Sequence, residues 1–240
     1  MKLIALQVKT TSDFSQNLKY LKQLIIECED NSIILAPEIA LSGFCYDRML
    51  EASNFSEKAI KEIKELSSNK TIALTFITKK EDNYFNTLYI FSNNEIIHTQ
   101  SKVMLFPLGN ELEHFNAGNE KDIKILEING IKIATLICFE LRFPKLWEKV
   151  KGADIILNPS MWGLKRKDHY ETISKSLALV NQCFVIASNS ADENMAKGSG
   201  IISPFGNVVR DDNSEIIQCE FDLDEIKKVR KYINIGLDNA

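Results

Sequence analysis

The chain has 240 residues, of which 45% are hydrophobic and 26% are charged, and its formal net charge at pH 7 is −4. These fractions match an average soluble globular protein, which excludes a disordered chain and a fibrous repeat. Because the charge is slightly acidic and no run approaches the roughly 20 apolar residues of a membrane helix, we expect neither nucleic acid nor a membrane as a partner.

Apolar runs of strand length alternate with helical patterns in the first half of the chain. The recurrence of apolar residues at three- and four-residue spacing predicts amphipathic helices. These helices are expected over residues 15–29, with Asp13 or Ser15 as the cap, and over residues 56–67, with Ser56 as the cap. The strands are expected at residues 3–8, 32–36, 71–78, 85–92 and 95–100. The turn dipeptide Asn93-Asn94 joins the last two into a hairpin.

The second half continues the alternation, with Asn129-Gly130 as a stronger hairpin signal. The strands are expected at residues 122–128, 131–138, 154–158 (closed by Pro159), 183–188, 199–203, 207–210 and 216–222. The helices are expected at residues 144–150, 167–181 and 223–232, the last near a cap at Asp222 or Asp224. Strands joined by hairpins and strands that follow helices both occur. We therefore predict a single α/β domain over residues 1–240 with mixed sheets.

The cysteines and histidines show no ligand spacing. The five cysteines are odd in number, without a CxxC pair, and the three histidines are scattered. We therefore expect neither a disulfide scaffold nor a metal, and no cofactor. The N-terminal MKLIALQVKT lacks a long apolar run and a cleavage site, which is unlike a signal peptide. A cytoplasmic location is the expectation.

Three reactive side chains follow predicted strands. Glu38, Lys102 and Cys138 each come at the carboxyl end of a predicted strand. Ligand sites in open α/β sheets gather at such ends, so the three residues form a candidate constellation. Taken singly, each has a plainer interpretation: a buried core cysteine, a solvated lysine and a locally paired glutamate. Spacing alone leaves the two interpretations balanced.

The segments around these residues resemble the nitrilase superfamily, the carbon–nitrogen hydrolases. Residues 35–44 (LAPEIALSGF), 102–107 (KVMLFP) and 138–144 (CFELRFP) are similar to its glutamate, lysine and nucleophile blocks. Further matches lie at residues 85–87, 115–118, 158–160, 181–185, 198–200 and 203–206. They run in order through nearly the whole chain. The resemblance implies a four-layer αββα sandwich with two mixed β-sheets.

The resemblance also implies a mechanism. Cys138 would be the nucleophile that forms a thioester with an amide or carbamoyl group, and Glu38 would be the general base. The Lys102 ammonium would favour the Cys138 thiolate. It would also face the developing oxyanion, together with the Phe139 backbone N–H.

Other site residues follow from the same resemblance. A second glutamate near the lysine is a family feature, and Glu111 is preferred over Glu113, although both residues could lie on a solvated loop. Arg142 is a candidate for holding a substrate carboxylate or for a structural ion pair. Trp162 is expected near the pocket mouth, with simple packing as the alternative.

The chain departs from the family in its late helix. The family often has Arg-Ala-x-Glu-Asn there, whereas this chain has Leu177 and Val180 in place of the arginine and the glutamate. Family members usually form dimers across a helical face. We therefore expect a homodimer whose interface differs in detail.

The resulting hypothesis is an ω-amidase-like enzyme that hydrolyses the non-peptide C–N bond of a small dicarboxylic acid monoamide and releases ammonia. The alternative within the enzyme class is an N-carbamoyl-amine or N-carbamoyl amino acid amidohydrolase, which would release carbon dioxide as well. The alternative from another class is a catalytically silent binding or scaffold protein.

Overall fold

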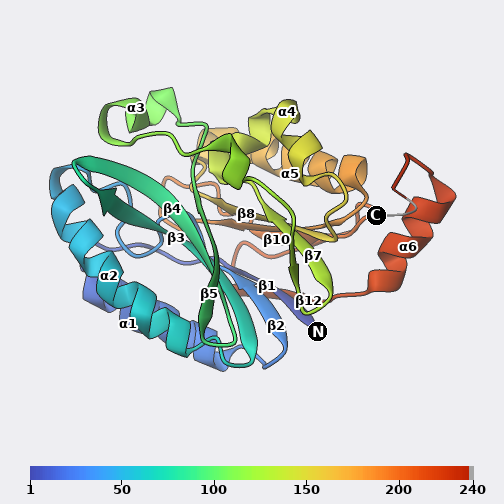
Figure 1. Ribbon diagram of the computed structural model, residues 1–240, viewed down its shortest axis with the longest axis horizontal. Coiled ribbons are helices and arrows are strands. Elements are labelled where there is room, and N and C mark those ends of the chain that lie inside the picture. The colour runs from blue at the N-terminus through green and yellow to red at the C-terminus, as the bar shows by residue number, and fades with distance from the viewer. Residues whose placement is uncertain (238–240) are drawn as a thin grey trace.

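Two six-stranded sheets pack face to face, and helices cover their outer faces (Figure 1). This arrangement is seen in a computed structural model that describes residues 1–237. It is the predicted α/β sandwich with two mixed sheets.

The strands and helices divide as follows. The first sheet contains β1 (Lys2–Leu6), β2 (Ser32–Leu35), β3 (Lys70–Lys80), β4 (Asn83–Ser92), β5 (Glu95–Ser101) and β12 (Ile216–Glu220). The second contains β6 (Leu126–Ile128), β7 (Ile131–Thr135), β8 (Ile155–Ser160), β9 (Phe184–Asn189), β10 (Gly200–Ile202) and β11 (Val208–Arg210). The α-helices are α1 (Phe14–Glu27), α2 (Met49–Glu65), α3 (Glu111–His114), α4 (Pro144–Trp147), α5 (Lys167–Asn181) and α6 (Leu223–Tyr232). The 3₁₀ helices are η1 (Tyr46–Arg48), η2 (Pro107–Gly109), η3 (Glu120–Asp122), η4 (Cys138–Arg142), η5 (Glu148–Val150) and η6 (Leu164–Arg166).

Both sheets are built on the same plan. Their strand orders are β12-β1-β2-β3-β4-β5 and β11-β10-β9-β8-β7-β6. In each sheet three central strands run parallel, β1, β2 and β3 in the first and β7, β8 and β9 in the second, and their outer neighbours pair antiparallel. The carboxyl ends of the parallel strands therefore gather at common edges, where ligand sites form in such sheets.

Side-chain alternation along the strands separates two cores. Leu3 and Ala5 of β1 point between the sheets, where they join residues such as Ile155 in one apolar cluster. Ile4 and Leu6 point the other way and pack against α1 and α2. Successive residues of a strand face opposite sides of a sheet, so continuous apolar runs are what strands buried on both faces require.

The predicted hairpin turns and helix cap are present. Asn93 and Asn94 both have positive φ, as do Asn129 and Gly130, and this is the backbone that two-residue hairpin turns require. The Asp13 carboxylate accepts a hydrogen bond from the Gln16 N–H at 3.0 Å and caps α1. These local signals act within a few residues, which is why the sequence alone located them.

The start of α2 was predicted wrongly. The helix begins at Met49, seven residues before the predicted cap, and Ser56 lies inside it. The Ser56 hydroxyl donates to the Ala52 carbonyl at 2.9 Å, the bond a mid-helix serine makes to the residue four before it. Because Ser53 and Ser56 occupy the buried face, the apolar periodicity was interrupted there.

The end of β8 was also predicted wrongly, because Pro159 lies within the strand. Beyond Leu157 the strand pairs with β9 but no longer with β7. Beyond Leu157, the side of β8 that faces β7 is therefore an unpaired edge. A proline, which lacks an N–H, is tolerated there.

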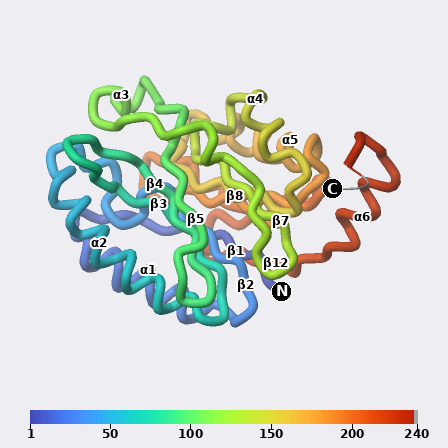
Figure 2. The backbone as a smooth tube through the Cα atoms, viewed as in Figure 1, coloured from blue at the N-terminus to red at the C-terminus, as the bar shows by residue number. Residues whose placement is uncertain are grey.

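The loop that carries α3 and the segment that carries α4 lie on the same side of the molecule (Figure 2).

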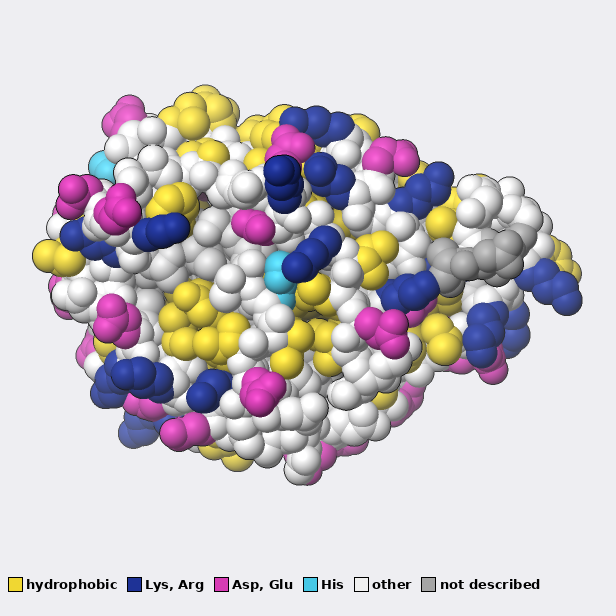
Figure 3. Space-filling model, in the orientation of Figure 1, with side chains coloured by type: hydrophobic (Ala, Val, Ile, Leu, Met, Phe, Trp, Pro, Cys, Tyr) yellow, Lys and Arg dark blue, Asp and Glu magenta, His cyan; other side chains and the backbone are white. Residues whose placement is uncertain are grey.

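Basic and acidic side chains are interspersed on the face shown in Figure 3, without a field of one sign. Within residues 1–237, no helix combines the length and the apolar character that crossing a membrane requires.

Candidate active site

The three strand-end residues meet in one buried centre. Glu38 follows β2, Lys102 directly follows β5, and Cys138 follows β7 and opens η4. The side chains of Glu38 and Lys102 are fully buried, and Cys138 is 7% exposed. The structure thus brings together, from both sheets, the residues that the sequence placed at strand ends.

Lys102 is the cation of this centre. Its Nζ lies 2.7 Å from Glu38 Oε1 and 2.7 Å from Glu111 Oε1. Glu111 is buried, whereas Glu113 is exposed, so the second glutamate beside the lysine is Glu111. Burial lowers the pKa of Lys102, but the neighbouring acids Glu38, Cys138 and Glu111 outweigh it and raise the pKa above its ordinary value. The lysine is therefore an ammonium.

Glu38 has one oxygen engaged and one free. Its Oε1 accepts from Lys102 and from Asn86 Nδ2, the latter at 2.8 Å. Its Oε2 is buried and has no hydrogen-bond partner among residues 1–237. A buried acceptor without a partner is costly, so it marks a position where a proton or a ligand is taken up.

The lysine and its second glutamate are held by backbone contacts. The Lys102 N–H donates to the Asn86 carbonyl at 2.8 Å, and the Lys102 carbonyl accepts from the Gly118 N–H at 2.8 Å. A Cβ at Gly118 would lie 2.2 Å from the Ser101 carbonyl oxygen, so only glycine allows this approach. Glu111 Oε2 accepts from the Phe106 N–H at 3.1 Å. These contacts fix the Lys102 side chain between its two acids.

Cys138 sits in a strained backbone conformation. Its φ of +47° lies in the left-handed region, which non-glycine residues rarely adopt and which clusters at functional sites. Burial and the nearby Glu38 raise the pKa of the Cys138 thiol, and Lys102 lowers it only in part. Lys102 thus favours the thiolate, as the resemblance implies, whereas burial and Glu38 favour the protonated thiol.

A further buried acid, Glu140, joins the loops that carry Cys138 and Lys102. One carboxylate oxygen accepts from the Val103 N–H and the other from the Ile137 N–H, both at 2.6 Å. These donors are the chain neighbours of Lys102 and Cys138. Burial raises the pKa of Glu140 to about 7, and the two N–H donors oppose this shift.

A small, open pocket lies beside Cys138. Its lining residues are Phe106, Cys138, Phe139, Arg142, Met161, Trp162 and Arg166. Arg142 is half-buried, with its guanidinium carbon 4.6 Å from the centre of the Trp162 ring. Trp162 is 4% exposed. The structure therefore places both predicted substrate-binding residues in the wall of the Cys138 pocket.

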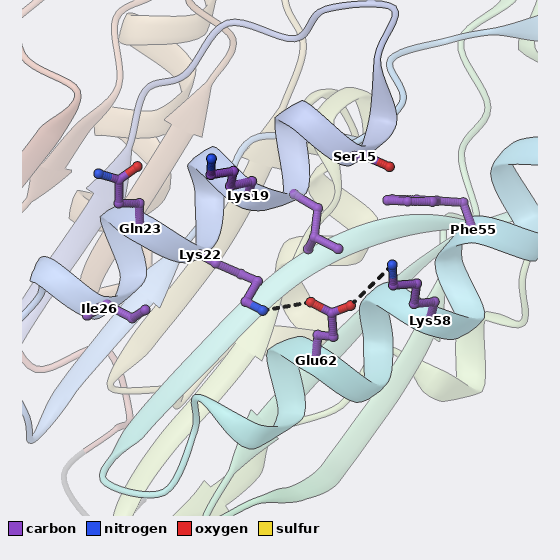
Figure 4. A pocket seen from close by; sticks show the side chains of 9 residues that line it. Ser15, Lys19, Lys22, Gln23, Ile26, Phe55, Lys58 and Glu62 are labelled. Atoms are coloured by element: carbon purple, nitrogen blue, oxygen red, sulfur yellow. Dashed lines mark hydrogen bonds and ion pairs between the residues drawn. The ribbon is translucent and has the colours of Figure 1, made fainter.

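Another hollow lies between α1 and α2 and shares no residue with the buried centre around Lys102 (Figure 4). Its Lys22 and Lys58 both point at Glu62, at 2.6 Å and 3.7 Å. Lys19 also lines this hollow, so three lysines and one glutamate give its lining a positive charge. Across residues 1–237, no group of three or more His, Cys, Asp or Glu side chains has an arrangement that could hold a metal ion.

Comparison with known proteins gives the family. The model of the carbon–nitrogen hydrolase family matches residues 3–231. The chain belongs to the carbon–nitrogen hydrolase family. It is 30% identical over 236 residues to 2-oxoglutaramate amidase of Bacillus subtilis, covering 92% of this chain and 90% of that protein. It is 25% identical over 205 residues to the omega-amidase YafV of Escherichia coli K12, covering 82% and 78%. The chain is therefore a hydrolase of C–N bonds.

A solved structure shares this fold. The nitrilase-superfamily protein XC1258 of Xanthomonas campestris, solved with an arsenic adduct in its active site, superposes with a TM-score of 0.88 at 21% identity. The match covers 100% of this chain and 97% of that one. The carbon–nitrogen hydrolase sandwich predicted from the resemblance is confirmed.

Three residues of the site were not singled out from the sequence. Asn86 and Glu140 lie in the matched segments 85–87 and 138–144, but no role was assigned to either residue there. Arg166 lies 28 residues after Cys138 in a charged run, Lys165-Arg166-Lys167-Asp168. Nothing local distinguishes it from a solvated arginine, because only the fold brings it to the pocket.

Proposed function

We propose that this carbon–nitrogen hydrolase is an ω-amidase-like enzyme. It cleaves the terminal amide of a small dicarboxylic acid monoamide, such as 2-oxoglutaramate, and releases ammonia through a thioester on Cys138. The observation that carries the proposal is the buried Lys102 ammonium between Glu38 and Glu111, with Glu38 Oε2 left without a partner in the described chain. The similarity to 2-oxoglutaramate amidase supports the substrate class.

The reaction begins with proton transfer. Glu38 Oε2 takes the proton of the Cys138 thiol, whose pKa is raised, as Sγ attacks the amide carbon. A lysine ammonium has three N–H donors, and Glu38 and Glu111 engage two of them. The third donor and the Phe139 N–H stabilise the oxyanion. Phe139 is the second residue of η4, so its N–H has no partner within that helix.

The intermediate then collapses and is hydrolysed. Glu38 gives its proton to the departing nitrogen, the C–N bond breaks, and ammonia leaves a thioester on Cys138. Glu38 then takes a proton from a water molecule, which attacks the thioester and releases the dicarboxylic acid. The thiol regains its proton from Glu38. One carboxylate thus serves both half-reactions.

Arg142 holds the substrate carboxylate in this proposal. Its guanidinium lies in the wall of the Cys138 pocket and has no carboxylate partner among residues 1–237. Trp162 supports it by stacking against it. Guanidinium groups bind carboxylates with two parallel hydrogen bonds, which suits the free acid end of a monoamide.

The enzyme acts as a cytoplasmic homodimer. All five cysteines are free, which suits a reducing compartment. Leu177 is buried, but Val180 is exposed beside Leu179, and Gly206 of the neighbouring β10–β11 turn packs on Leu179. An exposed apolar face of this kind supports contact with a second copy. Sedimentation velocity of the wild type and of Val180→Lys tests it: a monomeric wild type contradicts the dimer.

The test of the activity is ammonia release from a panel of ω-monoamides and N-carbamoyl compounds, with Cys138→Ala in parallel. Turnover of a monoamide that falls by at least about 10⁴-fold in the variant supports the proposal, as expected for loss of a nucleophile. Carbon dioxide released with ammonia identifies the N-carbamoyl alternative. Silence across the panel, with Cys138 inert to a thiol alkylator, identifies the binding-protein alternative.

A further inference from the structure

The pocket beside Cys138 contains a second guanidinium. Arg166 ends η6, is half-buried and lines the pocket together with Arg142. Its guanidinium carbon lies 5.2 Å from the centre of the Phe106 ring, and Arg142 is stacked on Trp162 in the same way. Aromatic faces thus hold both cations in the pocket wall, and they leave the edges of the two guanidinium groups available for hydrogen bonds.

Neither guanidinium is neutralised by the protein. Among residues 1–237, no Asp or Glu pairs with Arg142 or Arg166, and Arg142 contacts His169 Nδ1 at 3.0 Å instead. Two acids of the neighbouring segments, Glu171 and Asp212, are engaged with other cations. Glu171 pairs with Arg210 and Lys167, and Asp212 pairs with Lys167.

The positive charges of Arg142 and Arg166 interact unfavourably. Burial lowers the pKa of Arg142, and the positive charge of Arg166 lowers it further. Two like charges in a partly desolvated pocket repel, and an anion placed between them relieves that repulsion. The pocket is therefore prepared for a negative group.

We infer that Arg166 and Arg142 together form a two-guanidinium subsite that binds the carboxylate of the substrate and rejects an ammonium group next to it. The inference rests on the proposed function. A 2-oxo acid presents a carboxylate and a neutral acceptor to the two cations, whereas a 2-amino acid such as glutamine adds a positive charge. The subsite therefore selects 2-oxoglutaramate over glutamine, although the amide ends of both molecules are alike.

The experiment compares the wild type with Arg166→Gln, Arg166→Lys and the matched control Lys165→Gln, which removes an exposed neighbouring charge outside the pocket. The substrates are 2-oxoglutaramate, glutamine, glutaramate and the uncharged pentanamide. Arg166→Gln is expected to lower kcat/KM about tenfold for 2-oxoglutaramate and glutaramate. The same substitution should change kcat/KM for pentanamide less than threefold. It should also reduce the ratio of kcat/KM for 2-oxoglutaramate to kcat/KM for glutamine. Arg166→Lys should keep that preference, and Lys165→Gln should match the wild type.

The outcomes separate the subsite from the reaction. If the wild type hydrolyses pentanamide but no acid monoamide, the proposed function and the subsite fail together. If the wild type hydrolyses the acid monoamides and Arg166→Gln lowers kcat/KM equally for the charged and the uncharged substrates, the subsite alone fails.

Calorimetric titration with glutarate, the product of glutaramate hydrolysis, tests binding without turnover. Its affinity should fall about tenfold in Arg166→Gln and stay unchanged in Lys165→Gln. Equal affinity for glutarate in the wild type and Arg166→Gln overturns the inference.

Discussion

The buried centre around Lys102 and the pocket wall around Arg142 treat charge in opposite ways. In the centre, Lys102 is shared by Glu38 and Glu111, and both oxygens of Glu140 accept backbone N–H groups. In the wall, Arg142 and Arg166 are half-buried and have no carboxylate partner among the described residues.

The centre and the wall differ in whether their charges are paired by the protein or are left to be paired by a ligand. Buried charges must be matched within the fold, since an unpaired one costs several kcal/mol. The protein itself therefore supplies partners for Lys102, Glu111 and Glu140, and it leaves Glu38 Oε2 open. Charges that are to be matched by a ligand must stay partly solvated until the ligand arrives. Under the proposed function we expect variants of the centre to change kcat and variants of the wall to change KM.

The largest effect is expected from Lys102→Gln. The substitution leaves two buried carboxylates without their cation, and breaking a buried pair in this way costs about 3–5 kcal/mol. We expect the free energy of unfolding, measured with urea, to fall by that amount, and ammonia release to be lost. Lys61→Gln, which removes an exposed lysine from α2, is the control and should leave both unchanged. A Lys102→Gln variant as stable as the wild type would contradict a centre in which two buried carboxylates depend on Lys102.

The next effect is expected from Glu140→Gln. A glutamine offers one oxygen, so one of the N–H groups of Val103 and Ile137 loses its acceptor, which costs about 1–3 kcal/mol. Because these residues adjoin Lys102 and Cys138, kcat should fall and KM should stay nearly constant. Glu140→Asp, which keeps the carboxylate, should recover part of kcat. A change in stability without any change in kcat would limit Glu140 to a packing role.

The pH dependence of kcat tests the same residue. The pKa of Glu140 is raised to about 7, and only the ionised carboxylate accepts from both N–H groups. We therefore expect wild-type kcat to fall as the pH drops through about 7, with this limb absent in Glu140→Gln. The contribution of Glu140 to the free energy of unfolding has the opposite dependence on pH. The folded chain binds this proton more tightly than the unfolded chain, so this group favours folding at pH 5 more than at pH 8.

The centre could be predicted from the sequence because its parts are local. Glu38 and Cys138 each follow a buried apolar strand of a parallel set, whose carboxyl ends meet at common edges, and Lys102 directly follows the edge strand β5. The family resemblance then assigned the chemistry and the sandwich, and placed Glu111 ahead of Glu113. What the sequence could not give was the balance of charges: burial outweighs Lys102 at the Cys138 thiol, and burial follows from the whole fold.

The pocket wall could be predicted only in part, because it is assembled over distance. Arg142 and Trp162 were expected from motif positions, but Arg166 reaches the pocket from η6 by way of the fold alone. The start of α2 escaped prediction for a related reason. Ser53 and Ser56 lie on the buried face of the helix, where their hydroxyls bond to backbone carbonyls and hide the apolar pattern.

Arg142→Gln should change binding rather than chemistry. Its guanidinium is half-buried and thus partly screened, so its bond to a substrate carboxylate is expected to contribute about tenfold in KM. Steady-state kinetics on glutaramate should show KM raised and kcat within about threefold of the wild type. The contrast between centre and wall breaks down if kcat falls tenfold while KM is unchanged.

The smallest effect is expected from Trp162→Phe. The Trp162 ring lies 4.6 Å from the Arg142 guanidinium, and a phenyl ring weakens this cation–π contact by about 0.5–1 kcal/mol. The indole N–H is buried without a partner among residues 1–237, so its loss removes an unsatisfied donor and offsets part of the lost packing. We expect KM for glutaramate to rise about two- to fivefold with little change in KM for pentanamide. An equal rise for both substrates would mean that the ring shapes the pocket without supporting the arginine.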